Sequence, residues 1–176
     1  MKISPTKIAG VFTIEIEPFR DHRGFFARLQ CPTEMMAASI AFKPKQTSLS
    51  RNAAAGTLRG MHYATVAEAK LIRCVRGRIF DVAVDLRSGS PTLHQWVSVE
   101  LDAERANAMF IPHGVAHGFL TLAPDSDVLY QMDRLYAAGF DAGVRWNDPA
   151  FNITWPASPR VIAPRDQAFA LYNLGP

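Results

Sequence analysis

The segment RIFDVAVDL, residues 78–86, decides the fold class. Successive side chains of a β-strand point to opposite faces of the sheet, and this segment alternates accordingly. One face carries the bulky residues Phe80, Val82, Val84 and Leu86, and the other carries Ile79, Asp81, Ala83 and Asp85. The segment therefore predicts a strand with one packing row and with the Asp81 carboxylate on the opposite face.

Similar short apolar runs recur through the first three quarters of the chain, each bounded by Gly, Pro, Asn or Asp. This spacing is typical of an antiparallel sandwich or barrel, so the predicted fold class is all-β. The further expected strands are residues 11–17, 57–63, 71–75, 96–101, 118–122 and 128–132.

Helix signals are few. Residues 32–40 predict a short helix, because Pro32 suits a first turn and Glu34 lies near the positive end of the helix dipole. From residue 147 the chain is rich in proline, which favours a tail laid over the barrel with one helical turn at 167–172. A length of 176 residues predicts one domain, residues 1–176.

Composition excludes several classes of protein. No apolar run approaches the roughly 20 residues that cross a bilayer, and the N-terminal residues lack the apolar core of a signal peptide, so we expect a cytoplasmic protein and no membrane partner. Cys31 and Cys74 are too few for a disulfide framework or a zinc site, and we expect reduced packing residues. The net charge of +3 is scattered, which argues against nucleic acid but suits a phosphate-bearing ligand.

Two glycine-flanked histidine motifs, residues 59–63 (RGMHY) and 111–119 (IPHGVAHGF), are the candidates for chemistry. A metal site of the usual barrel type needs an H-x-H pair, which the chain lacks. His113 and His117 have a helical ligand spacing, but the proline and glycine between and beside them disfavour a helix. We therefore expect no metal and no cofactor.

General acid–base catalysis is the second interpretation. His62 lies on an expected strand near the cations Arg59 and Lys70, and Asp166 in the tail could fold back to orient the imidazole. Because Arg59 and His62 are three residues apart, a regular strand would send them to opposite faces. A bulge at Gly60 would bring both inward, and we predict one there.

Ordered motifs over nearly the whole chain resemble one known family, the dTDP-4-dehydrorhamnose 3,5-epimerases. The motifs are DHRGFF (21–26), LRGMH (58–62), KLIRC (70–74), FDVAVDLR (80–87), SPT (90–92), IP (111–112), AHGF (116–119), WNDP (146–149) and WP (155–156). The resemblance implies a cupin-type jelly-roll barrel, also called a double-stranded β-helix, with a few short helices. It also implies a homodimer that acts on a nucleotide sugar.

The same resemblance implies catalytic roles. His62 corresponds to the base, Asp166 to its partner, Tyr130 to the acid on the opposite face, and Lys70 and Arg59 to cations near the substrate. A sugar ketone at C4 acidifies the hydrogens at C3 and C5, and the enolate formed by their removal needs a nearby positive charge. Inversion also requires that the returning proton arrive from the other face.

Further positions resemble substrate contacts of the family. They are Arg23, Arg28, Gln46, Ser48, Arg59, His117, Tyr136, Asp141 and Arg165. Tyr136 resembles an aromatic that stacks on the nucleotide base, although core packing explains a lone tyrosine equally well. Asp81 and His117 could form a second carboxylate–imidazole pair behind the site.

Four of these positions depart from the family pattern. The family usually has glutamate at Arg28, asparagine at Ser48, glutamate at Asp141 and lysine at Arg165. The nucleotide, the exact sugar and the choice among C3, C5 or both therefore stay open.

The sequence thus predicts a metal-independent epimerase of a nucleotide-linked 4-keto-6-deoxy sugar in deoxysugar biosynthesis. One alternative is a ketoisomerase on the same fold, but this enzyme would need a single base, and Tyr130 argues against it. The other alternative is a sugar-binding cupin without catalysis, which has no need of both an acid and a base.

Overall fold

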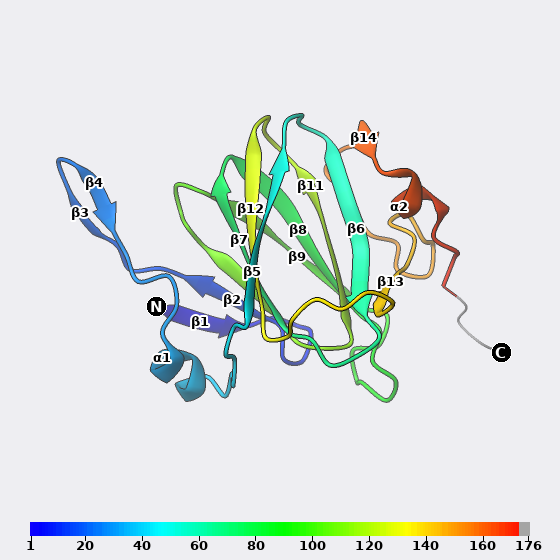
Figure 1. Cartoon of the computed structure of the whole chain (residues 1–176), viewed down its shortest axis with the longest axis horizontal. Coiled ribbons are helices and arrows are strands. Elements are labelled where there is room, and N and C mark those ends of the chain that lie inside the picture. Colours follow the sequence, from blue (N-terminus) through cyan, green and yellow to red (C-terminus); the bar gives the residue numbers. More distant parts are fainter. Residues whose placement is uncertain (173–176) are drawn as a thin grey trace.

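The computed structural model describes residues 1–172, which form two facing β-sheets and a separate hairpin (Figure 1). The first sheet has the order β1 (Lys2–Pro5), β2 (Phe12–Glu15), β10 (Ala108–Ile111), β7 (Lys70–Arg76), β12 (Ser126–Met132) and β5 (Gln46–Asn52). The second has the order β13 (Asp141–Gly143), β6 (Thr57–Ala64), β11 (Val115–Thr121), β8 (Arg78–Asp85) and β9 (Trp96–Asp102), with β14 (Val161–Ile162) beside β6.

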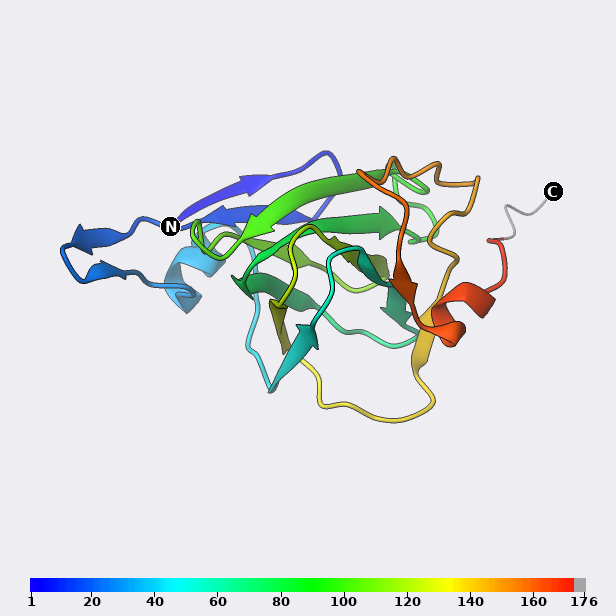
Figure 2. The ribbon, with the colours of Figure 1, turned by 90° about the horizontal axis from the view of Figure 1, so that it is seen from above.

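The remaining elements lie outside these sheets. They are the hairpin of β3 (Phe19–Asp21) and β4 (Gly24–Phe26), helix α1 (Pro32–Ala37) and helix α2 (Pro164–Ala168). The hairpin projects from one end of the molecule, whereas β6, β13 and α2 lie at the other end (Figures 1 and 2). Neither helix is long and apolar enough to cross a membrane.

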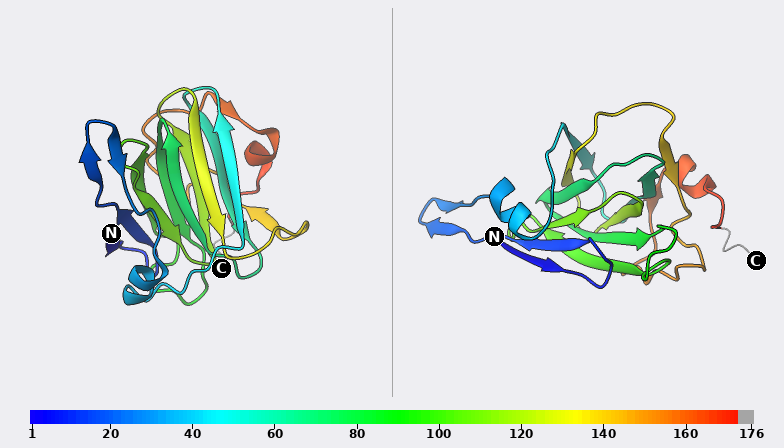
Figure 3. Two further views of the ribbon diagram at one scale, coloured as in Figure 1. Left: turned by 60° about the vertical axis from the view of Figure 1, so that its left-hand side comes forward. Right: turned by 90° about the horizontal axis from the view of Figure 1, so that it is seen from below.

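A core of apolar side chains fills the space between the sheets. It combines Ile72, Cys74, Met109 and Val128 of the first sheet with Ile79, Ala83, Leu101 and Phe119 of the second. Figure 3 (left) shows β7, β12 and β5 side by side in the first sheet. The molecule therefore has the predicted all-β, cupin-type jelly-roll architecture.

Strand β8 uses its two faces as the alternation predicts, but the bulky row does not face the space between the sheets. Phe80, Val82 and Val84 lie under the C-terminal segment. There the rings of Trp155 and Phe80 pack together, with 5.9 Å between their centroids. Ile79 and Ala83 enter the core between the sheets. Asp81, on the same face as these two residues, is consequently fully buried in the barrel interior.

All seven expected strands are present, with ends shifted by a few residues. No strand was expected at β1, β3, β4, β5, β10, β13 or β14. Helix α1 ends at Ala37 because the chain reverses at Ser39, which has a positive φ of 61°. The turn expected at 167–172 is wrong, since α2 spans Pro164–Ala168 and Phe169 is already extended.

Candidate active site

A bulge in β6 sets the position of His62. In the ladder with β11, His62 pairs with His117 and Arg59 pairs with Phe119, so β6 has one extra residue, as predicted. Gly60 lies where the strands touch, and a Cβ there would come within 2.6 Å of the Gly118 Cα. The bulge turns both Arg59 and His62 toward the inner face of the second sheet.

Asp166 of α2 reaches His62 from the far end of the chain. Its Oδ1 lies 2.7 Å from Nε2 of His62, and its Oδ2 accepts a 3.0 Å hydrogen bond from the Gly60 amide. Because a carboxylate only accepts, Nε2 carries the hydrogen, and Nδ1 is left to accept a proton. Burial alone would raise the pKa of Asp166, but hydrogen bonds from His62 and Gly60 hold this pKa below its usual value.

A second carboxylate–imidazole pair lies next to the first in the same sheet. His117, the register partner of His62, places Nε2 2.7 Å from Oδ1 of Asp81. Asp81 is completely buried, and its Oδ2 has no hydrogen-bond partner among residues 1–172. Burial raises the pKa of Asp81, while the charge and hydrogen bond of His117 oppose that rise.

Tyr130 faces these histidines from the other sheet. Its ring packs on the core between the sheets and meets the His117 ring edge-on, with 5.7 Å between centroids. Burial, reinforced by the nearby charge of Asp81, raises the pKa of Tyr130 far above its usual value. The phenol therefore keeps its proton at neutral pH.

Register places three more predicted residues on the face of Tyr130. Tyr130 pairs with Ser48, and Met132 pairs with both Gln46 and Lys70. Paired residues point to the same face, so Gln46, Ser48 and Lys70 border the phenol. The Lys70 ammonium lies 3.2 Å from a carboxylate oxygen of Glu68.

The remaining predicted contacts lie in different parts of the structure. Arg165 lies with Arg59, His62 and Asp166 around a cavity of about 360 Å³. Asp141 is exposed in β13, opposite Ala64 of β6.

Tyr136 is 65% exposed, so it is no core-packing residue. It lies in the wide loop between β12 and β13, and its amide donates to Gln46 Oε1 (Figure 2).

Arg23 and Arg28 do not join the site within one chain. Arg23 forms an ion pair with Asp21 in the projecting hairpin, and Arg28 forms one with Glu34 at 2.7 Å. Figure 1 shows this hairpin at the end of the molecule opposite α2.

Asn52 and Phe169, which were not predicted as site residues, also lie around the pair of His62 and Asp166. Asn52 accepts a 2.8 Å hydrogen bond from Nε of Arg59 and so holds this guanidinium beside the site. Phe169 packs its ring 5.9 Å from that of His62, over Gly143. Only Gly143 offered a signal, since a glycine in a strand often marks a close approach.

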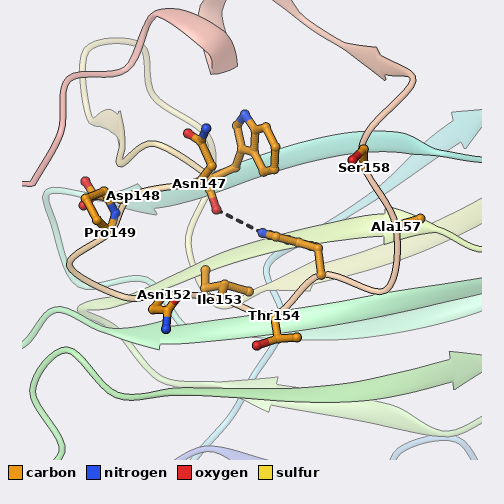
Figure 4. A pocket seen from close by; sticks show the side chains of 10 residues that line it. Asn147, Asp148, Pro149, Asn152, Ile153, Thr154, Ala157 and Ser158 are labelled. Atoms are coloured by element: carbon orange, nitrogen blue, oxygen red, sulfur yellow. Dashed lines mark hydrogen bonds between the residues drawn. The ribbon is translucent and has the colours of Figure 1, made fainter.

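A separate cavity of about 680 Å³ lies elsewhere, within residues 146–158 (Figure 4). Trp155 Nε1 donates to the Trp146 carbonyl across it, and the Asp148 oxygens accept from the Ala150 and Tyr172 amides. These bonds fold the segment on itself and tie it to Tyr172, and none of the predicted site residues lines this cavity. Within residues 1–172, no three His, Cys, Asp or Glu side chains gather in a way that could hold a metal ion.

Comparison with known proteins extends these observations. The sequence pattern described as dTDP-4-dehydrorhamnose 3,5-epimerase matches residues 5–173. The protein of that name from Sinorhizobium fredii is 41% identical over 160 residues, which cover 89% of this chain and 81% of the relative. The Bacillus anthracis structure of that name, with TDP and PPi bound, has a TM-score of 0.93 and 36% identity, and covers 97% of this chain and 99% of its own.

A third similar structure is ChmJ of Streptomyces bikiniensis, described as a 3′-monoepimerase in complex with dTDP-quinovose. It has a TM-score of 0.88 and 32% identity, and covers 96% of this chain and 86% of its own.

Fold and relatives together define an isomerase built on a cupin-type jelly roll. More specifically, the chain belongs to the dTDP-4-dehydrorhamnose 3,5-epimerase family.

Proposed function

We propose that this enzyme inverts C3, C5 or both in a nucleotide-linked 4-keto-6-deoxy sugar, with His62 as base and Tyr130 as acid. The observation that carries the proposal is their placement on facing sheets: His62 lies beside His117, and the His117 ring touches Tyr130 across the interior. A sugar ring between the sheets would present one face to the imidazole and the other to the phenol.

Each neighbouring group has a role in this scheme. Nδ1 of His62 removes the proton next to the ketone, and Asp166 stabilises the imidazolium through Nε2. Lys70 and Arg59 neutralise the enolate oxygen. Tyr130 then delivers a proton to the opposite face, which inverts the carbon. Arg165, Gln46, Ser48, Tyr136, Asp141 and His117 border the substrate.

The experiment is incubation with dTDP-4-keto-6-deoxyglucose in heavy water, with deuterium located by NMR. We expect deuterium at each inverted carbon. His62→Ala should lower its uptake by roughly 10²–10⁴-fold, whereas Asp166→Asn, which keeps the imidazole, should lower it less. Exchange at the parent rate in His62→Ala would show that another group is the base.

The working form is a homodimer in the cytoplasm. In one chain Arg23 and Arg28 lie far from His62, while the hairpin that carries Arg23 exposes Phe19 and Phe26 to 79% and 77%. Apolar rings with this exposure favour burial against another surface. If a second copy covers the hairpin, the Arg23 of one chain would lie toward the His62 site of the other chain.

A further inference from the structure

Helix α2, which carries Asp166, lies between two anchored segments: β14 pairs with β6 before the helix, and Phe169 packs on Gly143 after it. Helix α2 has five residues and no side-chain cap at its N-terminus. Short helices are marginal in water, so something else must keep the Asp166 carboxylate against His62 and Gly60. The next contacts along the chain come from Phe169.

The Phe169 ring packs directly on Gly143. The Cβ of any other residue at position 143 would occupy the space that the ring fills. Gly143 is the register partner of His62 in the β13–β6 ladder. A Cβ at Gly143 would overlap three atoms of the Phe169 ring. The ring also lies 5.9 Å from the His62 ring and 5.7 Å from the Arg165 guanidinium.

Arg145 holds the backbone of the same residue. Its Nε donates a 3.0 Å hydrogen bond to the Phe169 carbonyl. The residue between the two anchors, Val144, exchanges backbone hydrogen bonds with Met61, next to His62. Both anchors of Phe169 therefore belong to the chain segment that pairs with the strand of His62.

We propose that Gly143, Arg145 and Phe169 form a latch that positions Asp166 on His62. The three are positioning residues, because none needs to touch the substrate. The inference rests on the proposed role of His62 as base. It adds that the pair exists only while the C-terminal segment is seated on β13.

The test uses the full chain without ligand and follows two NMR signals: the Nε2 proton of His62, and exchange of the Gly60 amide, which Asp166 protects. In Phe169→Ala the His62 signal should move upfield, and Gly60 should exchange roughly tenfold faster. Turnover should fall by roughly 10- to 100-fold, because a small displacement of an orienting group is costly in catalysis. In an Asp166→Asn background, Phe169→Ala should cost no further turnover.

Gly143→Ala provides a second, independent variant. Gly143 lies outside the left-handed region, so its backbone accepts alanine and only the ring is displaced. Gly143→Ala should therefore change the His62 signal, the Gly60 exchange and the turnover as Phe169→Ala does. The double variant should lose no more turnover than Phe169→Ala alone. Arg145→Met should speed the exchange of the Gly60 amide, and Arg145→Lys should restore part of the protection of this amide. Leu171→Ala, which shortens a 52% exposed side chain of the same tail, is the matched control.

Unchanged His62 and Gly60 signals in Phe169→Ala would overturn the latch, whatever the activity. Additive losses in the Asp166→Asn background would also overturn it, because they would mean general destabilisation. The NMR signals need no substrate, so they test the latch even if the parent protein fails to epimerise the sugar. In that case the proposed function falls separately.

Discussion

In the proposed function, Tyr130 and His62 differ from the other ionisable residues of the barrel because their roles would depend on opposite faces of one substrate. His62 is 38% exposed in its side chain, so a sugar can reach it, and its partner Asp166 is almost fully buried. Tyr130 keeps its proton at neutral pH because burial raises its pKa. A base within reach and a protonated acid on the facing sheet are what inversion requires.

We predict that Tyr130→Phe separates exchange from inversion. His62 would still remove a proton and return deuterium to the same face, so label should enter without a change of configuration at any carbon that depends on Tyr130. The measurement compares the rates of deuterium uptake and of epimer formation by NMR, which stay coupled in the parent enzyme. Epimerisation at the parent rate, or an equal loss of both rates, would contradict the two-face assignment.

Among the elements, the turn from β8 to β9 depends on a single carboxylate. Asp85 is fully buried and accepts hydrogen bonds from the guanidinium and amide of Arg87 and from the hydroxyls of Ser90 and Thr92. Burial opposes ionisation, but these bonds outweigh it and hold the pKa of Asp85 well below its usual value. The ionised form therefore stabilises the folded state.

Asp85→Asn should lower the free energy of unfolding at pH 7 by roughly 2–4 kcal/mol, since an amide leaves charged and hydroxyl donors without acceptors. Because the folded pKa is depressed, the advantage of the parent is complete above the unfolded pKa of about 4 and is lost as pH falls through the folded pKa. Urea unfolding of both proteins between pH 7 and pH 3 should show that the difference between their free energies of unfolding shrinks below about pH 4. A gap that is constant across this range would mean that the charge of Asp85 contributes nothing.

At the scale of the whole molecule, the three apolar clusters share strands. Strands β7 and β10 contribute both to the core between the sheets and to the cluster that packs on α1, and β8 contributes to the core and to the cluster under the C-terminal segment. We propose on this basis that residues 1–176 fold as one unit. Thermal unfolding should then give one transition with coincident near- and far-ultraviolet circular dichroism, and an early separate transition of the C-terminal segment would argue against it.

The hairpin supplies the prediction for assembly. Changing both Phe19 and Phe26 to Glu should shift the protein from dimer to monomer in analytical ultracentrifugation, because the exposed rings would no longer be buried between copies. The barrel should keep its melting temperature, since neither side chain packs in it. Leu171→Ser, another exposed apolar residue, is the control and should leave the mass unchanged. A parent protein that sediments as a monomer would refute the dimer.

The sequence by itself determined the strands with strict alternation, the bulge and the fold class, because these depend on the local period of side chains and on glycines beside them. It did not reveal β5 or β10. Ser48 and Ser50 alternate with Thr47, Leu49 and Arg51, which is too polar to mark a strand, and Ala108–Ile111 is too short and evenly apolar to be distinguished from a loop. Pairing with strands on either side, which is a long-range event, decides both.

Only the tertiary structure decided the arrangement of the site. Asp166 meets Gly60 and His62 across more than 100 positions of the chain, and Phe169 meets Gly143 and Arg145 across more than 20. No local pattern encodes such contacts, because they depend on how the C-terminal segment returns to β6 and β13. Likewise, alternation placed Asp81 on the face opposite the bulky row, but only the packing of the two sheets made that face the inner one. Its contact with His117 followed from the pairing of β8 with β11.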